Sequence, residues 1–214
     1  MKISKRLQMI ASMVHTEHII DVGCDHGLLD VFLAKTRNIH CLACDISDNA
    51  LNHARENIKL YGMETLVQTL CTDGLTGVQA TKDDTVILSG MGTHTVIHIL
   101  EKRNDVEQCI ISTHTDVPYL RYWMNQNGFA IQDECFILEH GIAYVIISFS
   151  KKEIQYDESD YEIGPILKTN LSYLTYLLNE TQKIYQKIPL THKIQKEKLK
   201  EKIDMIKFCI KKAK

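Results

Sequence analysis

Four aspartates occupy positions where a short apolar run gives way to a polar or glycine-rich turn. Asp21 and Asp25 lie in the stretch DVGCDHG, whereas Asp45 and Asp73 each follow a further apolar run. Carboxylates that gather at one place attract a cation and accept hydrogen bonds from hydroxyl groups. These residues therefore predict a binding site for a positively charged ligand that carries hydroxyls.

The DVGCDHG turn is similar to the glycine-rich turn that holds the pyrophosphate of a dinucleotide, but Asp25 replaces a middle glycine. Gly23 and Gly27 permit a tight turn and close approach of the backbone to a ligand. A carboxylate at this position repels a pyrophosphate and favours a cation, such as the sulfonium and ammonium of S-adenosylmethionine. We therefore expect S-adenosylmethionine as the cofactor rather than a nicotinamide dinucleotide.

Two of the aspartates have the spacing of nucleoside contacts. Asp45 comes 22 residues after Gly23, where a carboxylate can accept hydrogen bonds from both ribose hydroxyls. Asp73 ends the third apolar run, where such folds often contact the adenine amino group. Capping of a helix is the alternative role for either residue. The expected cofactor contacts are Asp21, Gly23, Asp25, Gly27, Asp45, Ile46, Asp73, Gly74, Gly90 and Met91.

Short apolar runs alternate with amphipathic segments over the first 150 residues. The expected strands cover residues 18–22, 40–46, 66–73, 85–91 and 108–114, and the clearest helices cover residues 47–62, 93–104 and 116–128. Residues 129–151 read as two long strands joined around His140–Gly141. This pattern predicts an α/β fold with a class I Rossmann-like methyltransferase sheet, mostly parallel and closed by an antiparallel terminal hairpin. Ligands bind such sheets beyond the carboxyl ends of the strands, where the aspartates are expected.

The chain after residue 160 has a purely helical pattern. Apolar residues recur at spacings of four, three and four in two runs, namely Leu167, Leu171, Leu174 and Leu178, then Leu199, Ile203, Ile206 and Ile210. Pro189 separates the runs, so we expect one helix over residues 164–188 and an antiparallel helical hairpin packed as a coiled coil. The predicted organisation is a methyltransferase domain over residues 1–155 and a small C-terminal α-helical coiled-coil domain over residues 160–214.

The net charge of −2 is unevenly divided along the chain. Residues 1–150 hold 11 Lys and Arg against 18 Asp and Glu, whereas residues 183–214 hold 11 Lys against three acidic residues. A basic tail indicates an anionic partner, although a solvated lysine-rich helix face is an equally good interpretation of charge alone. The candidate contacts to the phosphates of a folded RNA are Arg6, Lys193, Lys196 and Lys200.

Several protein classes are disfavoured by composition. No apolar run reaches the roughly 18 residues of a membrane span, and the basic N-terminus lacks the apolar core of a signal peptide. The seven cysteines are scattered as expected of reduced thiols, and Cys41 and Cys44 have no second pair at zinc spacing. We expect a cytoplasmic protein with no membrane segment and no metal, monomeric unless the tail forms a dimer.

The motifs DVGCDHGLL, SGMGTHTVIHIL, LRYWMNQNGF and YEIGPIL resemble the TrmK family over nearly the whole chain. Members of this family are bacterial methyltransferases that modify ring nitrogen N1 of the adenosine at tRNA position 22. The resemblance therefore implies this activity, with tRNA as substrate. The chain departs from the family pattern at Cys24, Leu28, Asp30, Thr93 and in the segment ISTH. The alternative is a class I methyltransferase acting on another RNA, a protein or a small molecule, with the tail used for dimerisation.

The segment SGMG follows the fourth expected strand, where class I methyltransferases place residues that face the target base. Gly92 allows a flat base to approach the backbone, and we expect His94, a candidate catalytic residue, to reach that base. Tyr119 is the candidate stacking partner for an unstacked adenine. These three residues form the expected substrate slot.

The neutral ring nitrogen of adenine already carries a lone pair, so methyl transfer needs no base before attack and depends mostly on positioning. The product is a cation, which a nearby carboxylate stabilises. Asp25 is the candidate for this role, with His26 to orient it or to accept a proton later. Both residues could instead serve only the cofactor, and His26 could make a purely structural hydrogen bond.

Overall fold

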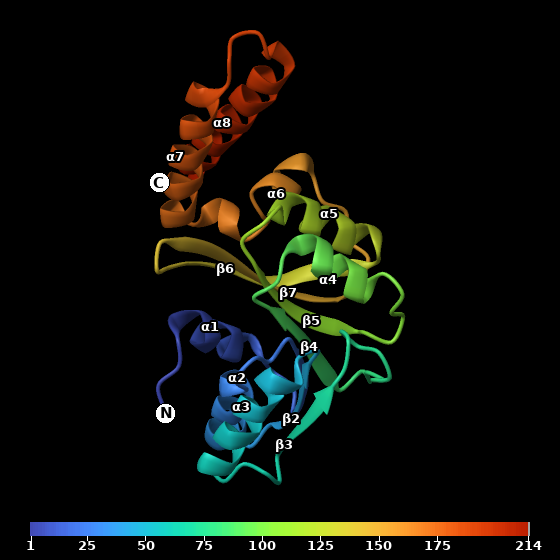
Figure 1. Cartoon of the computed structure of the whole chain (residues 1–214). Helices are drawn as coiled ribbons and strands as arrows, with labels where there is room; N and C mark the ends of the chain where they lie inside the picture. Colours follow the sequence, from blue (N-terminus) through green and yellow to red (C-terminus); the bar gives the residue numbers. More distant parts are fainter. Residues whose placement is uncertain (214) are drawn as a thin grey trace. The chain divides into compact units, whose positions relative to one another are not determined.

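The computed structural model describes residues 1–213, which divide into two compact units, residues 1–153 and 154–213. The strands of the first unit are β1 (His18–Val22), β2 (His40–Asp45), β3 (Val67–Cys71), β4 (Asp84–Ser89), β5 (Gln108–Thr113), β6 (Phe129–Glu139) and β7 (Ile142–Lys151). Its helices are α1 (Lys5–Met13), α2 (Leu28–Arg37), α3 (Asp48–Leu60), α4 (Thr93–Leu100) and α5 (Val117–Gln126). The strands form one seven-stranded sheet in the order β3-β2-β1-β4-β5-β7-β6 (Figure 1).

Strands β1 to β5 pair in parallel, and β7 pairs antiparallel with both β5 and β6. The predicted mostly parallel sheet with an antiparallel terminal hairpin is therefore confirmed. His140 and Gly141, at φ 51° and 80°, form the hairpin turn, because two left-handed residues match the twist of the flanking strands. The carboxyl ends of the parallel strands lie along one edge of the sheet.

Alternating strand residues supply the two faces of the sheet. Ile19, Cys41, Ile87 and Ile110 join buried residues of α1, α2 and α3 in one apolar core cluster. Figure 1 shows these three helices on one side of the sheet and α4 and α5, in green, on the other. Because helices cover both faces, the central strands are apolar at nearly every position, which is why they stood out in the sequence.

The observed helices are slightly shorter than the predicted ones, because local capping residues and glycines end them. The hydroxyl of Ser47 accepts a hydrogen bond from the Ala50 N–H at 3.3 Å, so Ser47 caps α3. Gly62 and Gly128, which follow α3 and α5, have φ of 68° and 79°. Glycines in this left-handed conformation commonly end helices.

Helix α1 is an element that the sequence interpretation did not include. The Ser4 hydroxyl caps it by accepting from the Leu7 N–H at 3.2 Å. At its other end the guanidinium of Arg37 donates to the carbonyl oxygens of Ala11 and Val14 at 2.8 and 2.6 Å. The first end of α1 is therefore capped locally, and its second end is attached to α2 through Arg37.

The second unit contains α6 (Glu158–Glu162), a short 3-10 turn (Leu167–Thr169), α7 (Leu171–Lys187) and α8 (Lys193–Ala213). The helix predicted over residues 164–188 begins later than expected, at Leu171. Asn170 caps it, since its side-chain oxygen accepts from the Tyr173 N–H at 3.0 Å. Pro189 follows the end of α7, in agreement with the expected break between the helices.

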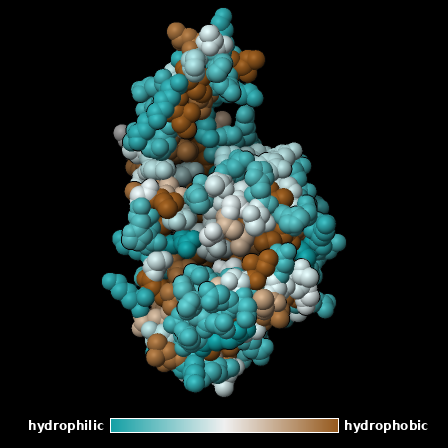
Figure 2. All heavy atoms as spheres, viewed as in Figure 1, coloured by the Kyte–Doolittle hydropathy of each residue, from teal (hydrophilic) through white to brown (hydrophobic). Residues whose placement is uncertain are grey.

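The seam between α7 and α8 differs in part from the predicted one. Leu171 is 39% exposed, because Leu167 lies in the 3-10 turn and the expected spacing does not follow one helical face. The buried residues of this unit include Asp160, Ile163, Leu167, Tyr173, Leu174, Thr181, Ile203, Ile206 and Cys209. Figure 2 shows hydrophobic residues along the middle of the hairpin and hydrophilic ones at its margins. Within residues 1–213, no helix is long and apolar enough to cross a membrane.

Candidate active site

The turn between β1 and α2 is attached to the end of β2. The backbone N–H groups of Gly23 and Cys24 both donate to the Cys44 carbonyl oxygen, at 2.9 and 3.0 Å. The Asp25 N–H donates to the Asp45 carboxylate at 3.1 Å. Asp25 has φ of 53°, a left-handed conformation that is uncommon for a residue with a side chain. Such conformations cluster at ligand sites, where the surrounding structure maintains them.

Gly23 and Gly27 are required by both conformation and space. Their φ angles are 78° and 63°, which favour glycine. A Cβ on Gly23 would lie 3.1 Å from the Met91 side chain, and one on Gly27 would lie 3.0 Å from Ala54. The close approach at Gly23 brings the SGMG turn after β4 against the DVGCDHG turn after β1.

A cavity of about 80 Å³ opens beside this turn. It is lined by Arg6, Leu7, Asp21, Gly23, Cys24, Asp25, His26, Leu28, Leu29 and Ser89. The structure thus brings together Asp21, Gly23, Asp25 and His26, four residues singled out in the sequence. It adds Arg6, which was expected to contact phosphates rather than to lie in this cavity.

Asp25 and His26 present their side chains to solvent. The His26 Nε2 lies 3.6 Å from the Asp25 carboxylate, and the two side chains are 50% and 73% exposed, respectively. The His26 ring packs 5.1 Å from that of His53, and its carbonyl oxygen accepts from Asn57 at 2.9 Å. Helix α3 therefore fixes the turn while the Asp25 carboxylate stays accessible to a cationic ligand.

Asp21 and Asp30 form a buried pair of carboxyl groups, 4% and 0% exposed. Burial, then the charge of Asp30 and a hydrogen bond with it, raise the pKa of Asp21 well above its ordinary value. Burial raises the pKa of Asp30 to about 7. Hydrogen bonds from the Asp30 backbone N–H and from Asp21 lower the pKa of Asp30, but less than burial raises it. The pair therefore holds a proton at neutral pH.

The other two aspartates lie at the ends of β2 and β3. The Asp45 carboxylate accepts from the Ser47 N–H at 2.9 Å as well as from the turn after β1, and the next residue, Ile46, is 69% exposed. Asp73 and Gly74 line a second cavity, of about 320 Å³, together with residues of α4. Asp73 thus lies apart from the smaller cavity, on the same edge of the sheet.

The SGMG turn lies between α1 and the segment that follows β5. Gly90 has φ of 82°, and a Cβ there would lie 3.5 Å from a guanidinium nitrogen of Arg6. A Cβ on Gly92 would lie 3.3 Å from the Thr115 hydroxyl. A flat ligand that approached this turn would therefore meet the Arg6 side chain on one side.

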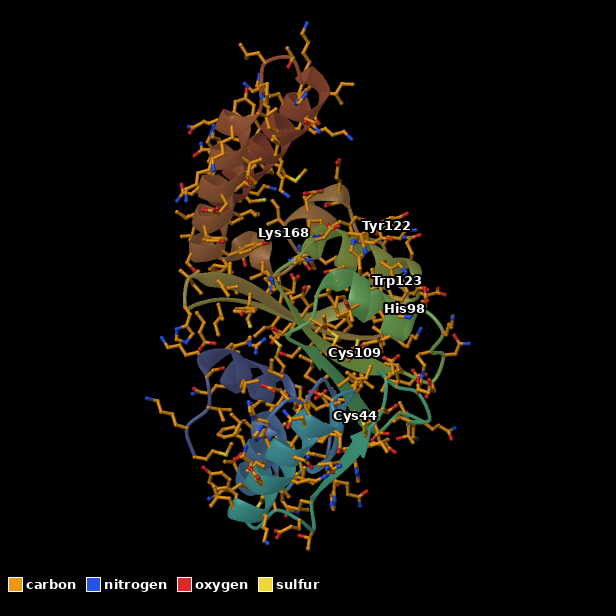
Figure 3. All side chains as sticks on the ribbon, in the orientation of Figure 1. Cys44, His98, Cys109, Tyr122, Trp123 and Lys168 are labelled. Carbon is orange, nitrogen blue, oxygen red and sulfur yellow. The ribbon has the colours of Figure 1, made fainter. Side chains whose placement is uncertain are left out.

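His94 and Tyr119, the expected base contacts, lie together. Their ring centroids are 5.9 Å apart, and Tyr119 is 41% exposed. Figure 3 shows Tyr122 and Trp123 on the same helix as Tyr119. Among the described residues, neither His94 nor Tyr119 belongs to the lining of the cavity at Asp25.

Arg6 and Ser89 are the polar cavity residues whose positions the sequence interpretation missed. Ser89 Oγ is buried and has no hydrogen-bond partner among the described residues. The sequence does contain a signal for the helix that carries Arg6. After the capping residue Ser4, apolar residues recur at spacings of three, one and three, as in an amphipathic helix. Nothing in the sequence near Ser89 marks its hydroxyl as unpaired.

Buried thiols lie beside this site. Cys24, Cys41 and Cys44 are free and buried. Burial, followed by the charges of Asp21 and Asp30, raises the pKa of Cys44 to about 12, so it is not a thiolate at neutral pH. Figure 3 shows Cys44 and Cys109 on the strands. Over residues 1–213, no group of three or more His, Cys, Asp or Glu is arranged to hold a metal.

The profile of a family described as a methyltransferase domain matches residues 3–147. The chain belongs to this methyltransferase family. A Bacillus subtilis (strain 168) methyltransferase named tRNA (adenine(22)-N(1))-methyltransferase is 26% identical over 227 residues, which cover 97% of this chain and 95% of that protein.

Two solved methyltransferase structures match equally completely. TrmK of M. capricolum, solved with S-adenosylhomocysteine, is 27% identical with a TM-score of 0.85, and 99% of each chain is covered. The Streptococcus pneumoniae protein Sp1610, solved with S-adenosyl-L-methionine, is 26% identical with a TM-score of 0.86, covering 98% of this chain and 100% of that one. The predicted resemblance to TrmK is therefore confirmed, whereas the roles of individual site residues stay predictions.

The Asp21–Asp30 pair predicts an unusual pH dependence of stability. The raised pKa of Asp30 means that, as pH rises from about 4 to about 7, the unfolded chain loses a proton that the folded chain retains. Stability therefore falls over this range, by about 1.4 kcal/mol for each unit of pKa shift. Asp30→Asn removes this loss, so its melting temperature should exceed that of the wild type by more at about pH 8 than at about pH 5 in thermal denaturation. An increment that is equal at both pH values would contradict the buried pair.

Proposed function

We propose that this protein transfers the methyl group of S-adenosylmethionine to ring nitrogen N1 of adenosine 22 in tRNA. The observation that carries the proposal is the row of carboxylates at the carboxyl ends of three adjacent strands, Asp21 with Asp25, Asp45 and Asp73. The whole-length similarity to TrmK and to the Bacillus subtilis tRNA (adenine(22)-N(1))-methyltransferase supports the choice of reaction and substrate.

The residues present suit this cofactor. Asp25 and the buried Asp21 face the same cavity and would meet the cationic end of the molecule. Asp45 would accept hydrogen bonds from the ribose hydroxyls, and the exposed Ile46 offers apolar surface beside an adenine ring. Asp73, with Gly74, would lie near the adenine amino group. Bound there, S-adenosylmethionine supplies a methyl group on a positively charged sulfur, which a neutral nucleophile can accept.

The chain then has to position the base and stabilise charge on it. The exposed carboxylate of Asp25 lies on a turn that Asp45 and α3 hold in place, so it is pre-organised for the positive charge that develops on the methylated ring. His26, 3.6 Å away, orients this carboxylate. The glycines of the SGMG turn let the base approach the backbone beside Gly23. His94 and Tyr119 flank this approach as secondary contacts.

Radiolabelled S-adenosylmethionine and unmodified tRNA from a bacterium provide the direct test of the reaction. We expect the label to appear in tRNA and to map, by nuclease digestion and mass spectrometry, to N1 of adenosine 22. A tRNA with guanosine at position 22 serves as the control and should stay unlabelled. Absence of label in tRNA, with a folded protein that binds the cofactor, would contradict the proposed function.

Asp25→Ala separates catalysis from cofactor binding. Because the carboxylate acts on charge that is present in the transition state, we expect the single-turnover rate to fall at least about 100-fold. The dissociation constant of S-adenosylmethionine, measured by calorimetry, should rise less than about tenfold. Asp83→Ala removes an exposed carboxylate outside the site and should change neither value. Loss of cofactor binding with a normal rate at saturation would show that Asp25 serves only the cofactor.

The second unit supplies the basic surface for an RNA substrate. Lys193, Lys196 and Lys200 recur at spacings of three and four on α8, so they share one side of that helix. Lys202 instead pairs with Glu162 at 2.6 Å and is a weaker candidate. The similarity to tRNA methyltransferases extends over this unit and favours RNA binding above a tail that serves only for dimerisation. We infer that the enzyme is cytoplasmic and monomeric and that it binds tRNA through the second unit.

Replacing Lys193, Lys196 and Lys200 with Gln should weaken tRNA binding and flatten its salt dependence. Each lost phosphate contact lowers the slope of log affinity against log salt by about 0.7 to 0.9. The matched control replaces Lys59, Lys82 and Lys152, three exposed lysines of the first unit, with Gln. Filter binding at several salt concentrations compares both variants. Equal slopes of log affinity against log salt in the two variants would show that these lysines of α8 do not bind RNA.

A further inference from the structure

Three side chains outside the assigned cofactor contacts meet beside the SGMG turn. The guanidinium carbon of Arg6 lies 4.9 Å from the centroid of the Tyr144 ring, a cation–π contact. The ring of His114 packs edge-on against the same tyrosine, with centroids 5.7 Å apart and planes at 77°. These residues come from α1, from β7 and from the segment directly after β5, and the fold alone brings them together.

The sheet register places this cluster at the edge where ligands bind. β7 runs antiparallel to β5, and Val145 pairs with Thr113, the last residue of β5. Tyr144 therefore lies at the carboxyl end of the parallel strands, next to His114. Because side chains alternate along a strand, Tyr144 faces the same side as Ile146, which is in the core cluster with α1.

Arg6 links this cluster to the cofactor cavity. Its side chain lines that cavity with Asp21, Asp25 and Ser89, and a guanidinium nitrogen lies 3.5 Å from the position of a Cβ on Gly90. The helix that carries Arg6 is fixed at both ends, and the Lys5 N–H donates to Glu139 of β6 at 2.8 Å. The surface made by Tyr144 and Arg6 is therefore rigid and continuous with the cavity.

A buried hydroxyl without a hydrogen-bond partner lies in the same cavity and indicates a ligand site there. Ser89 Oγ belongs to the cavity lining, is buried, and has no partner among the described residues. A buried hydroxyl without a partner is costly, and a ligand commonly supplies that partner. An amino group on a bound base would donate to it.

We propose that the ring of Tyr144, which contacts both Arg6 and His114, is the stacking surface for the target adenine, with the Ser89 hydroxyl accepting a hydrogen bond from the base's amino group. This inference rests on the proposed function, because it names the part of the site that holds the substrate. Aromatic rings and guanidinium planes are the groups on which proteins stack unpaired bases. Tyr144 is a substrate-binding residue beside the reacting atoms.

Tyr119, chosen from the sequence for this role, is less well placed. Its ring contacts His94, and neither residue lines the cavity that holds Asp25, whereas Arg6 joins the Tyr144 ring to that cavity. The base must present N1 to a methyl group near Asp25, so the stacking surface has to adjoin this cavity. The two tyrosines therefore make opposite predictions when each is replaced.

Steady-state methylation of tRNA by Tyr144→Ala, Tyr144→Phe, Tyr119→Ala and Tyr122→Ala tests the proposal. Loss of a stacking ring should lower kcat/KM for tRNA by about 10- to 100-fold in Tyr144→Ala. Tyr144→Phe keeps the ring and should stay within about threefold of the wild type, a rescue that a purely structural hydroxyl would not give. Tyr122→Ala removes an exposed tyrosine of α5 and is the matched control. The cofactor dissociation constant and the melting temperature of each variant report binding and folding separately.

Wild-type activity of Tyr144→Ala, or a loss confined to Tyr119→Ala, would overturn the proposal while leaving the proposed function intact. A loss of cofactor binding equal to the loss of activity in Tyr144→Ala would also overturn it, because the ring would then support the cofactor. Failure of the wild type itself to methylate tRNA would overturn the proposed function, and this inference with it. Ser89→Ala should lower kcat/KM for tRNA by about threefold to 30-fold without changing cofactor affinity.

Discussion

The site depends on the attachment of one turn to the neighbouring strand. Two backbone N–H groups after β1 share the Cys44 carbonyl oxygen, and the Asp25 N–H donates to the Asp45 carboxylate. These bonds hold Asp25 in a left-handed conformation and direct its carboxylate outward, 73% exposed. Without them the turn could relax, and the cavity beside it would lose one wall. The SGMG turn comes close to the same turn, since a Cβ on Gly23 would lie 3.1 Å from the Met91 side chain.

Charge divides the site into two parts with different chemistry. The buried carboxyls of Asp21 and Asp30 share a proton, since burial raises the pKa of both, whereas the Asp25 carboxylate is accessible to a ligand. Arg6 lies across the cavity and lowers the pKa of Asp21 through its charge, against the larger effect of burial. Positive charge that moves from a sulfonium to a base during methyl transfer would stay near the exposed acid throughout. This arrangement explains why an aspartate replaces the middle glycine of the turn.

The sheet and the cofactor edge could be predicted from sequence because buried parallel strands are continuous apolar runs, and aspartates mark their ends. The residues that surround the target base could not be predicted in this way. Arg6, Tyr144 and His114 are far apart in sequence and meet only through the antiparallel return of β7 and the docking of α1. Helix α7 began later than predicted because its spacing pattern crossed a 3-10 turn, which periodicity alone does not reveal. Local pattern therefore determined the elements, and tertiary packing determined the substrate slot.

In the proposed complex the strand-end carboxylates bind the methyl donor with its sulfur beside Asp25. A crystal structure of the protein with S-adenosylhomocysteine measures this directly. We expect ribose hydroxyls on Asp45, the adenine near Asp73 and Gly74, and the sulfur between Asp25 and Gly90, facing the ring of Tyr144. A ligand bound away from this edge, or bound there with its sulfur turned away from Asp25, would show that the carboxylates do not hold the methyl donor in this way.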